Sequence, residues 1–387
     1  MGEWVLENDF PISRYLIQKH GYRGIPISGQ FELTSRCNFN CKMCYVHGQK
    51  DPMKLKGKEL SVEQWITIAE DAKKSGMLFL LLTGGEAMLR DDFIELYQKL
   101  ATMGFRIVIN SNGSMLSEDV IQCFRKYPPA RINVSLYGAS DETYESLCGN
   151  RAYKKVRRAV HTLKEMGISV RTTMILTPYN VQDMEKIYQI SKEEDTLCEM
   201  TAYMFPPVRL DNGVCGYNKA RFSPEEAGTY MVKRERLLLG DEEFYKYSEN
   251  IKDAEPAPDM PEEYYKTGEP VNCQAGRGSF WITWDGRMLP CGMMMEDGVN
   301  VLDYGFKKAW ELTRETTGKI RLPVECVTCK NRKLCMACAS VCQAETGSFH
   351  KKPEYSCKMA EAMRKEYVIQ GADIAKHLEE SHGYTER

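Results

Sequence analysis

Grouped cysteines constrain the fold and chemistry of this chain more than any other feature of its sequence. The 387 residues include fifteen cysteines, most of which fall into two groups. The opening residues lack the charged and then apolar pattern of an export signal, so we expect a cytoplasmic protein whose thiols stay reduced. Grouped cysteines in such a protein more often bind metal or carry out redox chemistry than form disulfides.

Charge and hydropathy argue against two classes of partner. The chain has 52 basic and 54 acidic residues and a net charge of −2, which gives no global attraction to nucleic acid or to an anionic membrane. Its longest apolar run, residues 77–82, is far shorter than the ~18 residues that a membrane span needs. We therefore expect neither nucleic acid nor a membrane as a partner.

A repeated strand-then-helix pattern runs from about residue 30 to residue 204. This repetition predicts parallel strands joined by right-handed crossovers. Six such units make most of a TIM-like barrel, so the predicted fold class is α/β, a partial (β/α)6 barrel followed by a small cysteine-rich domain. The strands are predicted at residues 31–35, 78–83, 106–110, 131–136, 170–176 and 200–204. The helices between them are predicted at residues 61–74, 91–103, 117–126, 153–166 and 181–193.

The pattern changes after the barrel, which suggests a division into domains. The stretch from residue 253 to 270 is acidic and rich in proline, as linkers and exposed loops are. The cysteine-rich stretch after it has little helical periodicity and few apolar residues, so metal binding is expected to supply much of its stability. The predicted divisions are an N-terminal extension at 1–29, the barrel at 30–210, a helical and proline-rich connector at 211–270, the cysteine-rich domain at 271–357, and a helix and tail at 358–387.

The first cysteine group directly follows the first predicted strand. Cys37, Cys41 and Cys44 have the spacing C-x3-C-x2-C, at the strand end where barrel enzymes place their chemistry. Three thiolates without an obvious fourth ligand suit a four-iron cluster that has one open iron. A zinc ion would normally require a fourth ligand, for which His47 is the nearest candidate.

This motif resembles that of the radical S-adenosylmethionine (SAM) superfamily, and the resemblance covers about residues 30–204. It implies that the open iron of a [4Fe-4S] cluster binds the methionine part of SAM. Reductive cleavage of SAM then yields a 5′-deoxyadenosyl radical.

The same resemblance assigns roles to further residues. Gly84, Gly85 and Glu86 match the turn that receives the methionine amino group. The other implied cofactor contacts are Met43 against the adenine, Asn112, Ser135 at the ribose or carboxylate, and Arg151 at the carboxylate. Tyr137 stands where the family has an acidic residue, so that role is not transferred. The structural alternative for Gly84–Glu86 and for Asn112 is a simple turn. For Arg151 it is a position on the surface.

The second cysteine group is large enough for two four-thiolate clusters. Its members are Cys273, Cys291, Cys326, Cys329, Cys335, Cys338, Cys342 and Cys357. The array resembles the SPASM domain of radical enzymes that mature peptides and proteins. By analogy, one auxiliary [4Fe-4S] cluster is held by Cys326, Cys329, Cys335 and Cys357. Cys273 and Cys291 hold the other, completed by Cys338, by Cys342 or by both, because residue 339 is Ala where the family has a cysteine. Pairs with C-x2-C spacing also make zinc ribbons, which remains an alternative.

Four cysteines fit neither group. Cys123 and Cys198 lie in apolar patterns and are expected to be small buried residues. Cys148 and Cys215 lie in loop-like segments, where a hydrogen-atom donor is a further hypothesis.

The resemblance suggests an oxidoreductase that abstracts hydrogen from a peptide or protein, in the maturation of a ribosomally made peptide. Gly292 after Cys291 departs from the sulfatase-maturing type, which has an acidic residue there. About 30 residues precede the barrel, too few for a leader-binding module, so we expect either that a separate leader-recognition protein is a partner or that the substrate is small. The expected reductant is a flavodoxin or ferredoxin. The alternatives are a dehydrogenase or epimerase acting on a small molecule or single residue, and a zinc or iron–sulfur binding protein without turnover.

Overall fold

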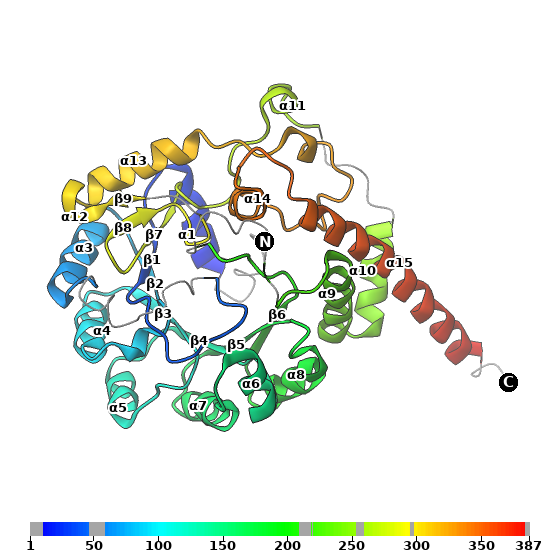
Figure 1. The fold of residues 1–387 in the computed structure, drawn as a ribbon, viewed down its shortest axis with the longest axis horizontal. Coiled ribbons are helices and arrows are strands. Elements are labelled where there is room, and N and C mark those ends of the chain that lie inside the picture. Colours follow the sequence, from blue (N-terminus) through cyan, green and yellow to red (C-terminus); the bar gives the residue numbers. More distant parts are fainter. Residues whose placement is uncertain are drawn as a thin grey trace.

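A nine-stranded sheet forms the centre of the protein, as a computed structural model shows. The structure describes residues 11–45, 59–208, 218, 220–252, 259–294 and 298–383. Six parallel strands, β1 to β6, follow one another in chain order and curve into an open barrel with helices outside it (Figure 1). The predicted partial barrel is therefore confirmed. The strands are β1 (Ser28–Glu32), β2 (Phe79–Thr83), β3 (Arg106–Ser111), β4 (Arg131–Ser135), β5 (Val170–Ile175), β6 (Leu197–Thr201), β7 (Ser279–Ile282), β8 (Arg287–Leu289) and β9 (Val299–Asn300).

The helices that cover the barrel are amphipathic and begin at capping residues. Ser61 caps the helix that follows it in a reciprocal capping box with Gln64, the start that the sequence predicted. The ring of Trp65 on that helix stacks on Phe31 of β1, with 4.9 Å between the ring centroids. The barrel helices are α3 (Val62–Lys74), α4 (Phe93–Thr102), α5 (Glu118–Lys126), α6 (Asp141–Cys148), α7 (Tyr153–Glu165) and α8 (Met184–Glu193), with short 3-10 turns η1 (Ala87–Leu89) and η2 (Val181–Asp183). The others are α1 (Pro11–Tyr22), α9 (Pro224–Leu239), α10 (Asp241–Lys252), α11 (Tyr264–Thr267), α12 (Val301–Tyr304), α13 (Phe306–Gly318), α14 (Ala339–Thr346) and α15 (Glu354–Gly383), with the 3-10 turn η3 (Val324–Cys326).

Two predicted strands are displaced by three residues. The first strand is residues 28–32 rather than 31–35, because the chain after Glu32 leaves the ladder and hydrogen-bonds to the turn that follows β2. The last barrel strand is residues 197–201 rather than 200–204, in register with β5. Helix α6 was not predicted, although Ser140 caps it and Gly149 ends it in the left-handed conformation.

The cysteine-rich region is joined to the barrel through the sheet. Strand β7 pairs with β1 in parallel, and β8 and β9 follow it as antiparallel neighbours. The expectation of little helical periodicity there was wrong, because α13 is a 13-residue helix. Phe306 and Trp310 of α13 pack on Phe280 of β7 and so extend the barrel core. A sequence window misses this because the apolar partners of α13 belong to the sheet.

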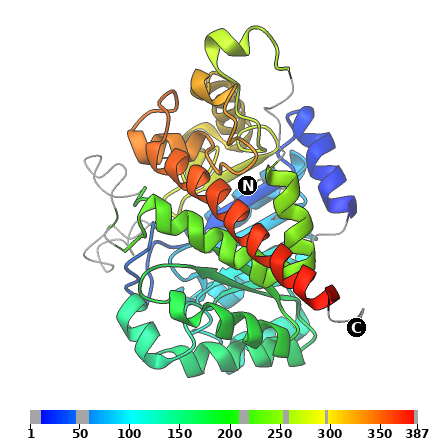
Figure 2. The same ribbon diagram turned by 90° about the vertical axis from the view of Figure 1, so that its right-hand side faces the viewer.

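The long C-terminal helix begins earlier than predicted. Helix α15 covers residues 354–383 and starts before the predicted boundary at residue 358, so its first turn contains Cys357. It crosses α9 and α10 along much of its length (Figure 2). The Arg364 guanidinium donates to the side chain of Asn331 at 2.7 Å and to the carbonyl of Ile251 at 2.9 Å. These contacts hold the end of the cysteine-rich region against the connector helices.

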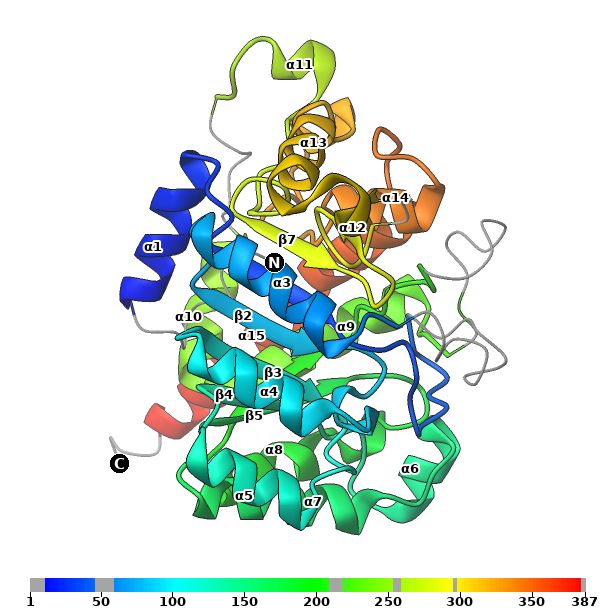
Figure 3. The same cartoon turned by 90° about the vertical axis from the view of Figure 1, so that its left-hand side faces the viewer.

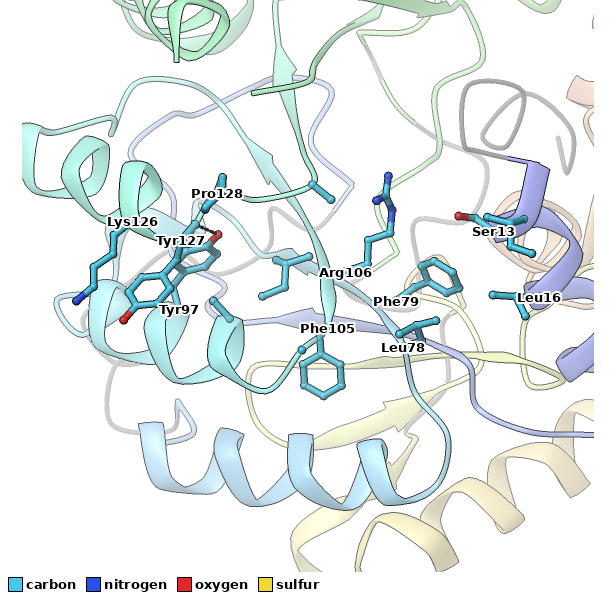
Figure 4. Close-up of a pocket in the computed structure, with 15 residues that line it drawn as sticks. Ser13, Leu16, Leu78, Phe79, Tyr97, Phe105, Arg106, Lys126, Tyr127 and Pro128 are labelled. Atoms are coloured by element: carbon cyan, nitrogen blue, oxygen red, sulfur yellow. Dashed lines mark hydrogen bonds between the residues drawn. The ribbon is translucent and has the colours of Figure 1, made fainter. Parts of the chain in front are cut away.

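The two ends of the barrel strands differ in what they present. Helix α1 lies at one end, as Figure 3 shows, and lines a pocket of about 620 Å³ with the first residues of β2 and β3. Figure 4 shows Phe79 and Arg106 facing the α1 side chains Ser13 and Leu16 there. The cysteine loop follows the opposite, carboxyl end of β1. Among the helices of the described ranges, none combines the length and apolar character that crossing a bilayer requires.

Candidate functional site

The first three cysteines share one loop that is fixed by the end of α6. The amides of Asn40 and Lys42 donate to the carbonyls of Cys148 and Leu147, both at 2.9 Å. Burial, together with smaller effects of the charges of Glu86, Cys41 and Cys44, raises the pKa of the Cys37 thiol to about 12. The loop therefore brings Cys37 near Cys41 and Cys44, and the buried thiols of Cys37 and Cys41 need a cationic partner when they are ionised.

Cys148 lies directly beside this loop, which the sequence did not reveal. It is the last residue of α6 and is fully buried rather than placed in a loop. A hydrogen bond between the Cys41 and Cys148 thiols, together with burial, raises the pKa of Cys41. Cys148 and Cys41 are too far apart in the sequence for a spacing motif to connect them. His47 and Cys215 lie outside the described residues.

The turn after β2 is bonded to the cysteine loop through its backbone. The Gly85 amide donates to the Thr34 carbonyl at 2.8 Å, and the Glu86 amide donates to the Arg36 carbonyl at 2.9 Å. A Cβ atom at Gly84 would lie 2.4 Å from the Thr34 oxygen, and one at Gly85 would lie 2.3 Å from the Arg36 oxygen. Only glycine permits this approach.

Glu86 is a buried carboxylate held by neutral donors. Its side chain accepts from the Asn112 amide at 2.7 Å, from the Ser111 hydroxyl at 3.1 Å and from the Met88 amide at 3.2 Å. Burial raises the pKa of Glu86, and these hydrogen bonds only partly offset the effect. A cation bound beside this carboxylate would relieve the cost of burying its charge.

Asn112 connects the end of β3 to the cysteine loop. Its Nδ2 donates to Asn38 Oδ1 at 2.9 Å and lies 3.8 Å from Cys37 Sγ. Its Oδ1 accepts from the amide and hydroxyl of Ser114. The side chain thus positions Cys37 and its loop.

Of the three remaining residues predicted to contact SAM, two lie at the carboxyl side of the barrel and the third forms ion pairs near the surface. Met43 is buried and Ser135 ends β4, both at the carboxyl side of the barrel. Arg151 has a half-exposed side chain and forms ion pairs with Glu142 and Glu145 of α6. These pairs match the surface alternative for Arg151.

The second cysteine group surrounds a single cavity of about 490 Å³. Its lining includes Cys273, Cys291, Cys326, Cys329, Cys335, Cys338, Cys342 and Cys357. Burial raises the pKa of Cys291 to about 12, with further effects from the thiols of Cys338 and Cys273. Burial likewise raises the pKa of Cys326 to about 12, and its neighbouring thiols are Cys335, Cys357 and Cys329. Cys291 thus lies near Cys338 and Cys273, and Cys326 lies near Cys335, Cys357 and Cys329, while Cys338 and Cys342 also lie near members of the second set.

This donor set fits iron–sulfur clusters. Eight sulfur donors line a space far larger than one ion, and thiolate is the usual ligand of such clusters. Within the described part of the chain, no three His, Cys, Asp or Glu side chains are gathered as ligands of a single metal ion.

A third cavity, of about 510 Å³, lies between the two cysteine groups. Met43 of the first cysteine loop lines it, and so do β5, β6, α9 and α15. The cavity shares four wall residues with the eight-cysteine cavity, namely Met293, Lys333, Cys335 and Met336. Methionine and aromatic side chains dominate this wall, which therefore suits a largely apolar ligand.

Sequence comparison defines the class of this site. Residues 31–190 match the family described as Radical SAM superfamily. The chain is 24% identical over 346 residues to the AdoMet-dependent heme synthase of Methanosarcina barkeri, covering 84% of this chain and 94% of that protein. The corresponding enzyme of Oleidesulfovibrio alaskensis is 23% identical, covering 84% and 86%. A probable GTP 3′,8-cyclase of Saccharolobus islandicus is 29% identical over 161 residues, covering 41% and 51%. The chain therefore contains a radical SAM domain in residues 31–190, and it is an enzyme.

Solved structures share the fold of most of the chain. Streptococcus suis SuiB bound to S-adenosylmethionine superposes with a TM-score of 0.64 at 15% identity, covering 88% of this chain and 80% of SuiB. The protein anSMEcpe with bound AdoMet superposes with a TM-score of 0.65 at 20% identity, covering 91% and 96%. SuiB has also been solved bound to its precursor peptide SuiA, with a TM-score of 0.64, 15% identity and coverage of 88% and 78%. At these identities the likeness establishes the fold alone.

Proposed function

We propose that this radical SAM enzyme abstracts a hydrogen atom from a substrate held in the methionine-lined cavity between its two cysteine groups. The observation that carries the proposal is that residues of both cysteine groups line that cavity. Met43, next to Cys44, contributes to one wall, and Cys335 of the second group contributes to another. A substrate carbon in this space lies near the source of the radical and near a second redox site.

The residues of the first site divide the task of holding SAM. Cys37, Cys41 and Cys44 would hold a [4Fe-4S] cluster. When bound and reduced, such a cluster would supply the electron for the reductive cleavage of SAM. Glu86 accepts the methionine ammonium, since its buried carboxylate has only neutral donors beside it among the described residues.

The remaining first-site residues orient the nucleoside. Gly84 and Gly85 let the backbone approach the ligand, and Asn112 positions Cys37. Met43 packs against the adenine and Ser135 contacts the ribose or carboxylate. Arg151 would have to leave its ion pairs with α6 to reach the SAM carboxylate.

Two auxiliary [4Fe-4S] clusters in a SPASM-like domain, residues 271–357, complete the proposal. The thiols around Cys326 form the outer ligand set and those around Cys291 form the inner set, with Cys338 next to Cys291 and Cys273. The nearest charged neighbours of Cys342 include Cys326 as well as Cys338, so Cys338 is the better candidate for the inner set. Clusters held there would supply an acceptor for the electron of a substrate radical, which would favour bond formation or desaturation.

A peptide or protein is the first candidate substrate. Structures with the same fold include SuiB with a precursor peptide and anSMEcpe with a peptide. We propose maturation of a ribosomally made peptide in the cytoplasm, with a separate leader-recognition protein and a flavodoxin or ferredoxin as reductant.

A small molecule is the second candidate, and two observations favour a tetrapyrrole. The two relatives that match most of the chain are named AdoMet-dependent heme synthase. An apolar cavity of about 510 Å³ also suits a flat macrocycle.

Colour and mass spectrometry test these proposals together. Anaerobically reconstituted protein should be brown and absorb near 400 nm, whereas colourless, zinc-loaded protein would contradict the cluster assignment. Peptides encoded beside the gene and a set of tetrapyrroles are then incubated with the reduced enzyme and SAM. Loss of two mass units from a peptide supports the first candidate. A SAM-dependent mass change in a tetrapyrrole alone supports the second.

A further inference from the structure

Arg171 lies inside the methionine-lined cavity with one of its donors unused. It is 4% exposed, and its Nη2 has no hydrogen-bond partner among the described residues. Its Nη1 pairs with Glu199 Oε2 of β6 at 3.2 Å. A buried N–H group on a charged side chain is costly to leave without an acceptor.

The strand geometry places Arg171 on the inner face of the barrel. The hydroxyl of Thr172 contacts the Ser191 hydroxyl of α8 at 2.7 Å, so Thr172 faces the helices outside. Because side chains alternate along a strand, Arg171 and Ile175 face the opposite side, and both line the cavity. Arg171 is the second residue of β5, and Ile175 ends it at the side of the cysteine loop.

The distance along β5 sets the length of a ligand that spans this cavity. Four residues of a parallel strand extend roughly 13 Å, at about 3.3 Å per residue. A ligand that reaches from the Met43 wall to Arg171 must therefore be elongated and apolar along its middle. At the Arg171 end it must offer an acceptor.

We infer that Arg171 binds a carboxylate at the far end of an elongated, apolar substrate, an inference that rests on the proposed function of the cavity. A guanidinium presents planar donors that match a carboxylate. The other charged groups lining the cavity are Glu199, Arg234, Glu235 and Lys333. Arg234 and Glu235 pair with each other at 2.9 Å, and Lys333 is exposed. The negative charge of Glu199 repels a second carboxylate at Arg171. The affinity for the carboxylate ligand is therefore expected to increase when Glu199 loses its charge.

Dodecanoate and the neutral dodecanol form a probe pair of suitable length for the anaerobically reconstituted protein. Isothermal titration should show that the wild type prefers dodecanoate by roughly tenfold or more. Arg171→Met should remove this preference without changing dodecanol binding, Arg171→Lys should retain part of it, and Glu199→Gln should increase it. Lys333→Met is the matched control, which removes an exposed charge from the same cavity wall and should keep the preference. Unchanged preference in Arg171→Met, or its loss in Lys333→Met, would overturn the inference.

Two further probe pairs distinguish the source of the carboxylate. Protoporphyrin IX is compared with its dimethyl ester, and an apolar hexapeptide with a free C-terminus is compared with its amide. An Arg171-dependent preference for the acid in either pair identifies that source, and its absence in both overturns the inference. Cleavage of SAM by the wild type is measured separately. Its failure contradicts the proposed function, whereas failure of the probe preference alone contradicts only the role of Arg171.

Discussion

The carboxylate of Glu86 is buried, and a bound cation would stabilise its charge. Its carboxylate is buried at the carboxyl end of the barrel, and its described contacts are two backbone amides and a hydroxyl. Burial raises its pKa, so the free protein binds a proton there more readily than an exposed glutamate does. A bound ammonium would take the place of that proton.

The affinity for SAM should therefore depend on pH through Glu86. The ammonium binds the ionised carboxylate, so affinity is full above the raised pKa and falls about tenfold per pH unit below it. Glu86→Gln should weaken binding by roughly 10- to 100-fold and abolish this dependence. Equilibrium dialysis of SAM between pH 8 and pH 5 measures both effects. An identical pH profile in the variant would contradict the assignment.

At the residue scale, the sequence predicted local motifs but not contacts between distant segments. Gly84, Gly85 and Glu86 are adjacent, so their motif indicates a ligand turn without a structure. The contact of Cys148 with Cys41 joins residues that no motif connects. The position of Arg171 in a cavity depends on strand register and on helices far along the chain. Local signals thus indicated the cysteine loop and the turn after β2, whereas the cavity that Met43 and Arg171 line depends on contacts between distant segments.

At the element scale, the turn after β2 and the cysteine loop behave as one unit. Two backbone hydrogen bonds join them, and the absence of side chains at Gly84 and Gly85 permits their approach. The position of the thiols therefore depends on glycines that hold no metal.

Gly84→Ala should disturb both stability and cluster binding. The new Cβ would lie 2.4 Å from the Thr34 oxygen at a φ of +150°. We expect a loss of about 2–4 kcal/mol in unfolding free energy and a lower iron content. Gly167→Ala is the matched control, because Gly167 has a φ of +74° with no atom within 4 Å. It should cost about 1 kcal/mol and leave iron content unchanged. Equal iron content in the two variants would argue against the coupling.

The sequence predicted elements best where local periodicity and packing agree. Helix α3 was predicted closely, because Ser61 and the apolar spacing after it mark the same start. Helix α13 and strand β7 were missed because the segments that they contact are distant in the sequence. Phe306 of α13 packs on Phe280 of β7, and β7 pairs with β1, only in the folded protein. The shifts of β1 and β6 have the same cause, since pairing with a neighbour decides where a strand ends.

At the scale of the whole molecule, long-range contacts hold the barrel and the cysteine-rich region together. The Arg221 guanidinium and the Tyr203 hydroxyl donate to Glu345 at 2.8 and 2.9 Å, connecting the end of β6 to α14. Helix α15 adds Cys357 to the second group and packs along α9. The barrel and the cysteine-rich region therefore share a sheet and a cavity wall.

Iron content should divide according to the two groups. Reconstituted wild type is expected to bind about twelve irons, from three four-iron clusters. Replacing Cys37, Cys41 and Cys44 by Ala should leave about eight, and replacing Cys273 and Cys291 should remove iron while sparing the first cluster. Iron analysis and electron paramagnetic resonance distinguish the two losses. A first-group variant that retained twelve irons would contradict the assignment.

Metal should also stabilise the cysteine-rich region selectively. Thiols line its cavity, so removal of the metal by a chelator would leave these thiols without a cationic partner. Hydrogen exchange of residues 326–342 should accelerate after iron removal, whereas β3 and β4 should stay protected. Uniform acceleration throughout the chain would show that the region has no separate dependence on metal.

The most direct test of the central claim is release of 5′-deoxyadenosine by the reconstituted protein with dithionite and SAM. We predict SAM-dependent release by the wild type and none above background by Cys41→Ala, whose second cysteine group is intact. Equal release by the two proteins, or no release by a wild type that carries its full iron content, would contradict the account.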